Sequence, residues 1–382
     1  MSDANALRSA YRIVAPTTRT GASVHAIIPT PVESFPTSPY QDPFVAEPSK
    51  LQPALGHAIQ KAETRCRQAA GSFPVPFTIA EVTTGPPFPM AAYRDSEVDY
   101  IASEAKVAVL YAAYEMRAMV RRFAAANPLL TTAQFFPQMA AVQTPKFLHA
   151  VPLINSATNI TDTQRKPSYT AMFSPTPNAS GLIDFTSGYL TSLNQMIIPS
   201  NNSAAMSCIH GLGYSYLNGA LFAAGFFDGT AGVWIGSDYQ MGQVWPPVRA
   251  VQTQNDGPGT LTGTTHQMAR ILALILIGQL VDPASSSEMD GILRKAAQGD
   301  DTPWTARDNQ RLPVAKFVYN KLGLGPKGSG PQEFRSEVSV IEDPVRVGST
   351  YAVAWQNLLQ TTPYDLSDMT SVILDTITEY EQ

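Results

Sequence analysis

Cysteine, charge and clustered histidine are all scarce in this chain of 382 residues. Cys66 and Cys208 are the only cysteines, so a framework of disulfide bonds does not hold the fold together. Charged residues make up 15% of the chain and the formal net charge is −5, which argues against a nucleic-acid-binding surface. The five histidines lack the spacing of a metal site, and we expect neither a metal nor another cofactor.

Long apolar runs are missing as well. The longest largely apolar block, 271–281, is too short to cross a bilayer, and we expect no membrane partner. Residues 1–14 lack the apolar centre of a secretory signal, which predicts a cytoplasmic protein, with an exported mature form as the alternative. Apolar residues nevertheless make up 44% of the chain, which is enough to bury a large core.

Proline is abundant in residues 1–48, where it prevents a continuous helix and deprives a sheet of hydrogen-bond donors. Apolar residues between these prolines predict an ordered arm that wraps over the body of the protein or over a second copy in a homo-oligomer. Residues 49–382 are predicted to form one domain. Within it, 49–100 and 300–382 would make an α/β lobe, and 101–299 would make a helical lobe.

Apolar periodicity predicts strands near both ends of the chain and helices between them. The expected strands are 77–82, 90–94, 314–321, 334–342 and 349–355, and the expected helices are 51–70, 103–126, 264–277 and 365–381, with further helical segments within 190–225 and from 283 onward. This order predicts an α+β fold: an antiparallel sheet from the N- and C-terminal parts, flanked by helices, plus an all-helical lobe. An active site would lie between the lobes.

Ser103 and Lys106 stand at the head of an apolar helix. They are three residues apart and share one helical face, directly before the apolar run 107–114. Burial disfavours the charged form of a lysine and can make it a proton acceptor, and a base one turn from a serine hydroxyl creates an activated nucleophile. The plainer alternative is that Ser103 caps the helix and that Lys106 extends its ammonium group to the surface.

Three short motifs in this order resemble those of the penicillin-recognising serine enzymes, which include the class A β-lactamases and the DD-peptidases. The segment 103–106 (SEAK) matches S-x-x-K, the segment 200–202 (SNN) is similar to S-D-N, and the segment 321–323 (KLG) is similar to K-T-G. The segment 192–194 (SLN) also fits the second pattern. The resemblance covers about residues 51–382 and implies a β-lactamase/transpeptidase-like fold.

By this resemblance, Ser103 attacks an acyl carbonyl and Lys106 accepts its proton. Ser200 would pass a proton to the leaving group, and Asn202 would hold Lys106 and the substrate amide. Lys321 would supply positive potential near Ser200 and an acidic substrate group.

The resemblance also implies where the substrate binds. The backbone N–H groups of Ser103 and Leu324 would form an oxyanion hole. The candidate substrate contacts are Leu322, Gly323, Arg335, Tyr239 and Trp234.

Two departures from the family pattern argue against rapid hydrolysis of antibiotics. Leu322 replaces the hydroxyl residue that binds the substrate carboxylate in the family. In addition, residues 203–261 contain no glutamate to drive deacylation, and the surroundings of Asp238, the best-placed aspartate, do not match the family loop. Candidate auxiliary bases are Tyr214, Tyr216 and Tyr239, with core packing as the alternative role of each; Phe226, Phe227, Trp234, Tyr239 and Trp245 would line an apolar pocket or belong to the core.

The sequence thus predicts an acyl-serine hydrolase or acyltransferase that acts on a small amide, ester or lactam. A first alternative is a catalytically altered protein of the same fold that binds a ligand or a partner. A second is a structural subunit that uses its proline-rich arm to oligomerise.

Overall fold

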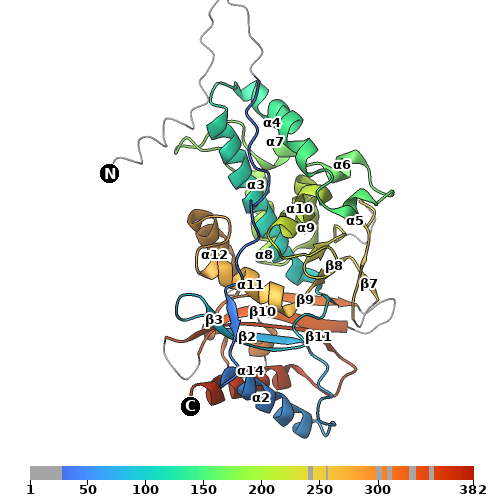
Figure 1. Ribbon diagram of the computed structural model, residues 1–382, viewed down its shortest axis with the longest axis vertical. Coiled ribbons are helices and arrows are strands. Elements are labelled where there is room, and N and C mark those ends of the chain that lie inside the picture. Colours follow the sequence, from blue (N-terminus) through green and yellow to red (C-terminus); the bar gives the residue numbers. More distant parts are fainter. Residues whose placement is uncertain are drawn as a thin grey trace, which may run out of the picture.

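The structure is a computed structural model that describes residues 28–239, 244–254, 257–297, 303–307, 312–326, 333–343 and 348–382. Its centre is a six-stranded sheet in the order β1-β3-β2-β11-β10-β9 (Figure 1). These strands are β1 (Phe44–Ala46), β2 (Phe77–Glu81), β3 (Phe88–Tyr93), β9 (Phe317–Pro326), β10 (Glu333–Glu342) and β11 (Thr350–Leu359). Two small sheets are formed by β4 (Asp99–Tyr100), β8 (Leu261–Gly263) and β5 (Trp234–Ile235), and by β6 (Val251–Gln252) and β7 (Pro258–Gly259).

Helices cover both faces of the large sheet. One face carries α2 (Leu51–Arg65) and α14 (Leu366–Tyr380), and the other carries α11 (Thr265–Leu276) and α12 (Pro283–Ala297) (Figure 1). Beyond α11 and α12 lies a helical lobe made of α3 (Lys106–Ala126), α4 (Thr132–Phe147), α8 (Ser187–Ile197), α9 (Asn202–Leu212) and α10 (Tyr214–Ala223). The shorter helices are η1 (Ala102–Ala105), α5 (Pro152–Asn155), α6 (Asp162–Arg165), α7 (Tyr169–Met172), α13 (Trp304–Arg307) and η2 (Val314–Lys316). The predicted α+β class is confirmed.

The sheet joins the two ends of the chain, because β2 pairs with β11 in an antiparallel register that sets Thr78 opposite Ala354. The prediction of a wholly antiparallel sheet is wrong at one edge, where β1 runs parallel to β3. This strand lies between Pro43 and Pro48, and the prolines are tolerated there because an edge strand needs donors on one side only. Helix α2 also ends five residues earlier than predicted.

Helix α3 is the axis of the helical lobe. Every residue from Lys106 to Arg117 is buried, because α8, α9 and α10 all pack against this helix. The buried Arg117 would be costly without a partner, and it donates two hydrogen bonds of 2.7 and 2.9 Å to the carboxylate of Glu288. In the described residues no helix is both long and apolar enough to span a membrane.

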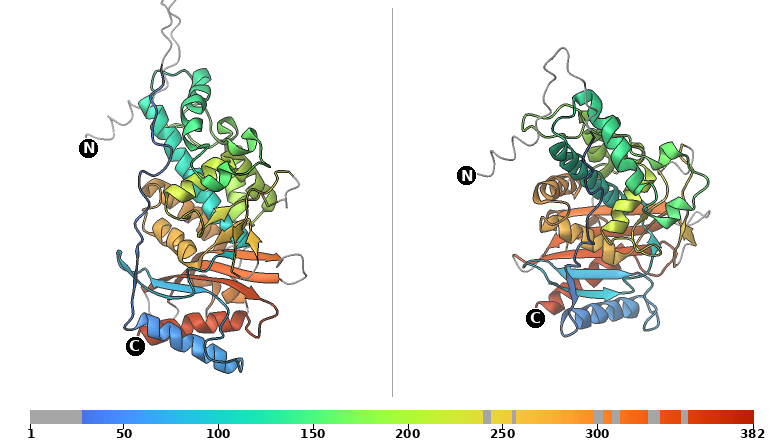
Figure 2. Two further views of the ribbon diagram at one scale, coloured as in Figure 1. Left: turned by 45° about the vertical axis from the view of Figure 1, so that its right-hand side comes forward. Right: turned by 45° about the horizontal axis from the view of Figure 1, so that its top comes forward.

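Within the described part of the predicted arm, residues 28–43 lie along the helical lobe of their own chain before the chain reaches the sheet (Figures 1 and 2). Tyr40 is an anchor of this segment, since its N–H group donates to Ala224 at 3.1 Å and its hydroxyl donates to Glu115 at 3.4 Å. Residues 1–27 lie outside the described residues, and oligomerisation through the arm stays a prediction.

His266 hydrogen-bonds the end of this arm to the body of the protein. Its ring nitrogens lie 2.7 Å from a carboxylate oxygen of Asp42 and 3.1 Å from one of Asp95. Burial alone lowers the pKa of His266, but the two carboxylates outweigh burial and raise this pKa to about 9. The native state therefore retains a proton that the unfolded chain releases above about pH 6.5.

We expect the arm contact to make stability depend on pH. The stabilisation from His266 is complete below about pH 6.5 and is lost above about pH 9, because the raised pKa belongs to the folded state. The His266→Gln substitution should lower the free energy of unfolding by about 2 kcal/mol at pH 6 and by much less at pH 10, as measured by urea denaturation. His57→Gln is the matched control, since His57 also faces a carboxylate, that of Glu379, but is largely exposed. Parallel pH profiles for the wild type and His266→Gln would contradict the assignment.

Candidate active site

A strained turn presents Ser103 where the helical lobe meets β9. The turn η1 continues directly into α3, and Ala102 within it has a φ of +44°, a conformation that residues with a Cβ atom seldom adopt. Ser103 is half-exposed, although Ala102, Glu104 and Ala105 on either side are buried. The local backbone thus directs one hydroxyl toward solvent at the head of a buried helix.

Lys106 lies one turn further on and is fully buried. Its Nζ atom is 2.6 Å from the carbonyl oxygen of Ser200, 2.8 Å from Oδ1 of Asn202 and 3.2 Å from the hydroxyl of Ser200. Lys106 therefore does not extend to the surface, and the structure brings the first and second motif segments together.

The side chains of Ser192 and Asn194 in the competing segment hydrogen-bond to the backbone of their own helix. The hydroxyl of Ser192 donates to the carbonyl of Gly188 at 3.2 Å, and the amide of Asn194 donates to the carbonyl of Leu190 at 2.8 Å. Of the two candidates for the second motif, the segment 200–202 is the one that contacts Lys106.

Asn201 occupies the place of the aspartate in the family's second motif. Its side chain caps α9, since Oδ1 accepts a hydrogen bond of 2.9 Å from the N–H group of Ala204. Asparagine and aspartate are comparably good at this position. The departure at 201 is therefore compatible with the same local structure, in which Ser200 adopts a φ of +56° and turns the chain toward Lys106.

A pocket of about 330 Å³ opens beside Ser103 at the free edge of β9. Its lining combines neutral polar and apolar side chains with backbone: Tyr100, Ala102, Ser103, Asn202, Ser237, Tyr239, Pro247, Thr260, Leu261, Leu324 and Gly325. Every one of these lining residues is uncharged. Leu324 is 45% exposed, and its place at the mouth of the pocket is compatible with the expected role of its backbone N–H group.

The three residues of the third motif segment, 321–323, differ in the face of β9 that they occupy and in what they pack against. A Cβ atom on Gly323 would lie 2.5 Å from the carbonyl oxygen of Ile101, so glycine permits the close approach of β9 to η1. Lys321 is fully buried on the same side of β9 as Tyr319, whose hydroxyl bonds to α11. Leu322 is on the opposite side, which faces α13, and it pairs with Glu337 of β10.

Three predicted substrate contacts lie elsewhere in the described structure. Strand alternation turns Leu322 into the core, where it is 4% exposed. The guanidinium group of Arg335 lies over the ring of Trp304, 5.1 Å from its centre. Trp234 is fully buried, and its indole N–H group donates to the carbonyl of Arg249 at 2.9 Å.

Tyr239 is the predicted substrate contact that does line the pocket. Its hydroxyl donates to the carbonyl of Ala102 at 3.0 Å, and the Nζ atom of Lys106 lies 4.8 Å from the centre of its ring. Burial raises the pKa of Tyr239 well above its usual range, which disfavours the tyrosinate that a base would have to be. Tyr214 and Tyr216 are fully buried core residues whose pKa values burial also raises.

Asp238 points away from the pocket, although Ser237 and Tyr239 on either side line it. Its carboxylate is fully buried and accepts hydrogen bonds from His210 at 3.0 Å and from the backbone N–H of Trp245 at 3.1 Å. The ring of Trp245 stacks on that of His210. The predicted aromatic pocket residues Phe226 and Phe227 belong to the core.

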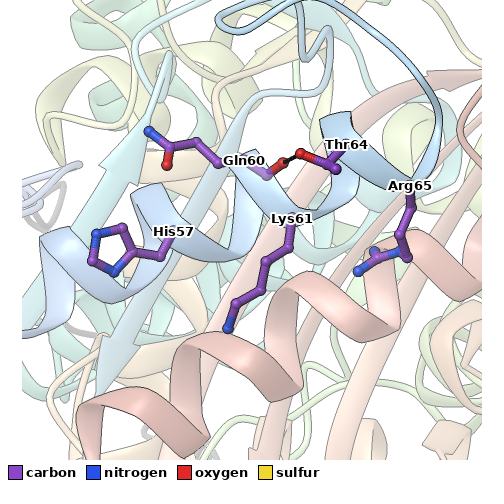
Figure 3. Close-up of a pocket in the computed structure, with 5 residues that line it drawn as sticks. All are labelled: His57, Gln60, Lys61, Thr64 and Arg65. Atoms are coloured by element: carbon purple, nitrogen blue, oxygen red, sulfur yellow. Dashed lines mark hydrogen bonds between the residues drawn. The ribbon is translucent and has the colours of Figure 1, made fainter.

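A second cavity, of about 570 Å³, lies on α2 (Figure 3), on the face of the large sheet opposite the helical lobe (Figure 1). It is lined by His57, Gln60, Lys61, Thr64 and Arg65. Carboxylates of α14 already pair with its basic side chains, since Arg65 lies 3.1 Å from Asp368 and Lys61 lies 3.7 Å from Glu379. Surface pairs of this kind contribute little energy.

Comparison with known proteins identifies the fold. No family model matches the chain, and no curated protein sequence matches it. A variant of the extended-spectrum β-lactamase TLA-1 is 12% identical, with a TM-score of 0.51, over 86% of this chain and 99% of that one. The chain has the β-lactamase fold.

Further solved structures match with lower TM-scores. A mutant of the class A β-lactamase of the last common ancestor of Gram-negative bacteria is 16% identical, with a TM-score of 0.49, over 86% of this chain and 99% of that one. A β-lactamase from Chitinophaga pinensis is 14% identical, also at 0.49, over 85% and 98%. At these identities the likeness concerns the fold alone.

Sequence reasoning missed several residues of the pocket in this β-lactamase fold. They are Tyr100, Ala102, Ser237, Pro247, Thr260, Leu261 and Gly325. Ser237 adjoins the aspartate that drew attention to its loop, and Tyr100 precedes the first motif by three residues. Thr260 and Leu261 reach the site because β8 pairs with β4 and β5, and Gly325 lies on β9, so the local sequence around them gives no sign of the pocket.

The close approach of β9 to η1 gives a prediction about stability. Gly323→Ala should lower the free energy of unfolding by about 2 to 3 kcal/mol, because the new Cβ atom meets a backbone oxygen that cannot turn aside. Gly291→Ala is the control, since no atom lies within 4 Å of a Cβ at this helical position, and it should be neutral or stabilising by up to about 1 kcal/mol. Equal unfolding midpoints for the two variants would show that the two elements do not approach closely.

Proposed function

We propose that this protein is an acyl-serine hydrolase or acyltransferase that acts on a small amide, ester or lactam. The observation that carries the proposal is the arrangement around Lys106, whose Nζ atom contacts Ser200 and Asn202 at the base of the pocket that Ser103 lines. A lysine amine with two fixed acceptors is held in place for proton transfer, and a half-exposed serine one turn away is accessible to an acyl group.

The proposed first step transfers the acyl group to Ser103. The Oγ atom of Ser103 bonds to the carbonyl carbon of the substrate while its proton moves to the neutral amine of Lys106. The backbone N–H groups of Ser103 and Leu324 stabilise the negative oxygen of the tetrahedral intermediate, and one such donor is typically worth about 3 to 4 kcal/mol. The bond to the leaving group then breaks, and the leaving group takes the proton from Lys106 through the hydroxyl of Ser200.

The proposed second step is slow. An acyl-enzyme needs a base to activate water or another acceptor, and the described lining of the pocket contains hydroxyl and amide groups but no carboxylate. Asp238, which lies between two pocket residues, already accepts hydrogen bonds from His210 and Trp245. We therefore expect the acyl-enzyme to accumulate and hydrolysis of penicillins to be inefficient.

The decisive measurement is the intact mass of the protein after incubation with a fluorophosphonate. We expect one adduct on the wild type and none on Ser103→Ala, because Ser103 is the proposed nucleophile. Ser192→Ala is the matched control, since Ser192 belongs to the alternative motif segment and should leave the adduct unchanged. Absence of an adduct on the wild type would favour the alternative, a catalytically altered β-lactamase-fold protein that binds a ligand or a partner; the buried positions of Lys321 and Leu322 are the observations that favour it.

Slow deacylation gives a second prediction, about kinetics. With a 4-nitrophenyl ester of an uncharged acid, the wild type should release about one equivalent of nitrophenolate in a burst, followed by a slower steady state. Lys106→Met should slow the burst by at least about a hundredfold, because the proton acceptor is removed. A linear time course at high turnover, without a burst, would contradict the proposed slow step.

A further inference from the structure

Tyr239 joins the loop after β5 to the turn that carries Ser103. Its hydroxyl donates a hydrogen bond of 3.0 Å to the carbonyl oxygen of Ala102, a residue 137 positions earlier in the chain. Burial raises the pKa of Tyr239 well above its usual range, so the hydroxyl stays protonated and remains a donor. Tyr239 and Ala102 both line the pocket, and the hydrogen bond between them therefore lies in its wall, beside Ser103.

The carbonyl of Ala102 belongs to the same peptide group as the N–H of Ser103. A trans peptide group is planar, so its C=O and N–H bonds point in opposite directions and can only turn together. A donor that fixes the oxygen of Ala102 therefore also fixes the direction of the Ser103 N–H group. This N–H group is one of the two proposed oxyanion-hole donors, and its place in the first turn of η1 leaves it without an acceptor inside the helix.

The backbone is strained at both ends of this hydrogen bond. Ala102 has a φ of +44° and Tyr239 has a φ of +67°, and residues with a Cβ atom keep such conformations only where the surrounding structure holds them. Asp238 provides that support for the loop, because its carboxylate accepts hydrogen bonds from His210 of α9 at 3.0 Å and from the backbone N–H of Trp245 at 3.1 Å. The phenol of Tyr239 therefore extends to Ala102 from an anchored segment.

We propose that Tyr239 is a positioning residue of the oxyanion hole, whose hydroxyl aligns the peptide group between Ala102 and Ser103 for the acylation step. This inference rests on the proposed acyl-serine function. The phenol donates to the oxygen of this peptide group while its nitrogen donates to the negative oxygen of the tetrahedral intermediate, and hydrogen bonds in such a chain strengthen one another. Tyr239 acts through the peptide group and does not touch the reacting atoms.

The test is Tyr239→Phe, which removes the hydroxyl and keeps the ring whose centre lies 4.8 Å from the Nζ atom of Lys106. With a 4-nitrophenyl ester of an uncharged acid, the rate of acylation at saturating ester should fall about tenfold. The ester concentration that gives half of this rate should change by less than about twofold, because the hydroxyl acts in the transition state. The burst amplitude counts the active sites, so unfolded protein does not enter the rate.

Phenylboronic acid supplies a readout that a merely structural role would not move. Its boron bonds to the Oγ atom of Ser103, the serine proton moves to Lys106, and an oxygen of the negatively charged tetrahedral adduct occupies the oxyanion hole. The inhibition constant should therefore rise in Tyr239→Phe by about the factor by which acylation slows. The pH profile of acylation should stay the same, because the ring beside Lys106 is retained. A shifted profile would show that the hydroxyl transfers protons, and it would overturn the proposal.

Tyr93→Phe is the matched control. The hydroxyl of Tyr93 also donates to a backbone carbonyl, that of Phe73 at 3.1 Å, but Tyr93 belongs to β3, toward the edge of the large sheet that is opposite β9. We expect this variant to keep the wild-type acylation rate and inhibition constant. Equal constants for Tyr239→Phe and Tyr93→Phe would overturn the inference.

His210→Phe decides the matter if Tyr239→Phe does not fold. This substitution keeps an aromatic ring against Trp245 but removes the hydrogen bond to Asp238 that anchors the loop. The acylation rate should then fall at least about threefold at an unchanged half-saturating concentration, and a wild-type rate would contradict the proposed role of Tyr239. Failure of the wild type to form a fluorophosphonate adduct would instead remove the underlying function.

Discussion

The buried amine of Lys106 is the contact on which the rest of the site depends. A lysine inside a protein costs several kcal/mol unless its polar atoms are satisfied, and here the oxygens of Ser200 and Asn202 satisfy them. If the loop before α9 moved away from α3, the amine of Lys106 would lose these acceptors, and its burial would then cost several kcal/mol. Because Lys106 follows η1 without a break, the position of Ser103 is set by the same contact. The packing of the helical lobe thus determines where Ser103, the proposed nucleophile, lies.

The sheet supplies the second constraint. Pairing of β2 with β11 joins the two ends of the chain, and β10 then holds β9 at the edge of the sheet that faces η1. Gly323 allows this edge to approach Ile101 more closely than any residue with a side chain would permit. The absence of a Cβ atom at Gly323 therefore sets how closely the sheet approaches the turn that carries Ser103. The pocket forms where the free edge of β9 passes the strained turn at Ala102.

Much of this arrangement was predictable, because local sequence patterns determine it. Apolar periodicity located most strands of the large sheet and the long helices α2, α3, α11 and α14, and the spacing of Ser103 and Lys106 drew attention to a serine that lines the pocket. What the sequence could not reveal was which side chains of a strand face the pocket. Leu322 and Arg335 were expected to contact substrate, but strand alternation and the ring of Trp304 draw them away. The parallel edge strand β1 was missed for a related reason, since its pairing partner is distant in the sequence and its composition argued against a strand.

Conserved architecture and altered chemistry are compatible here because they depend on different atoms. At 12% identity to a β-lactamase of known structure, the fold persists through apolar contacts that many side chains can satisfy. The carboxylate of Asp238 next to the pocket is instead bound within the protein itself, since it accepts hydrogen bonds from His210 and Trp245. Changing the partner of a buried charge takes one or two substitutions, whereas moving a strand takes many. A site within this fold can therefore acquire a different substrate preference while the backbone around it stays in place.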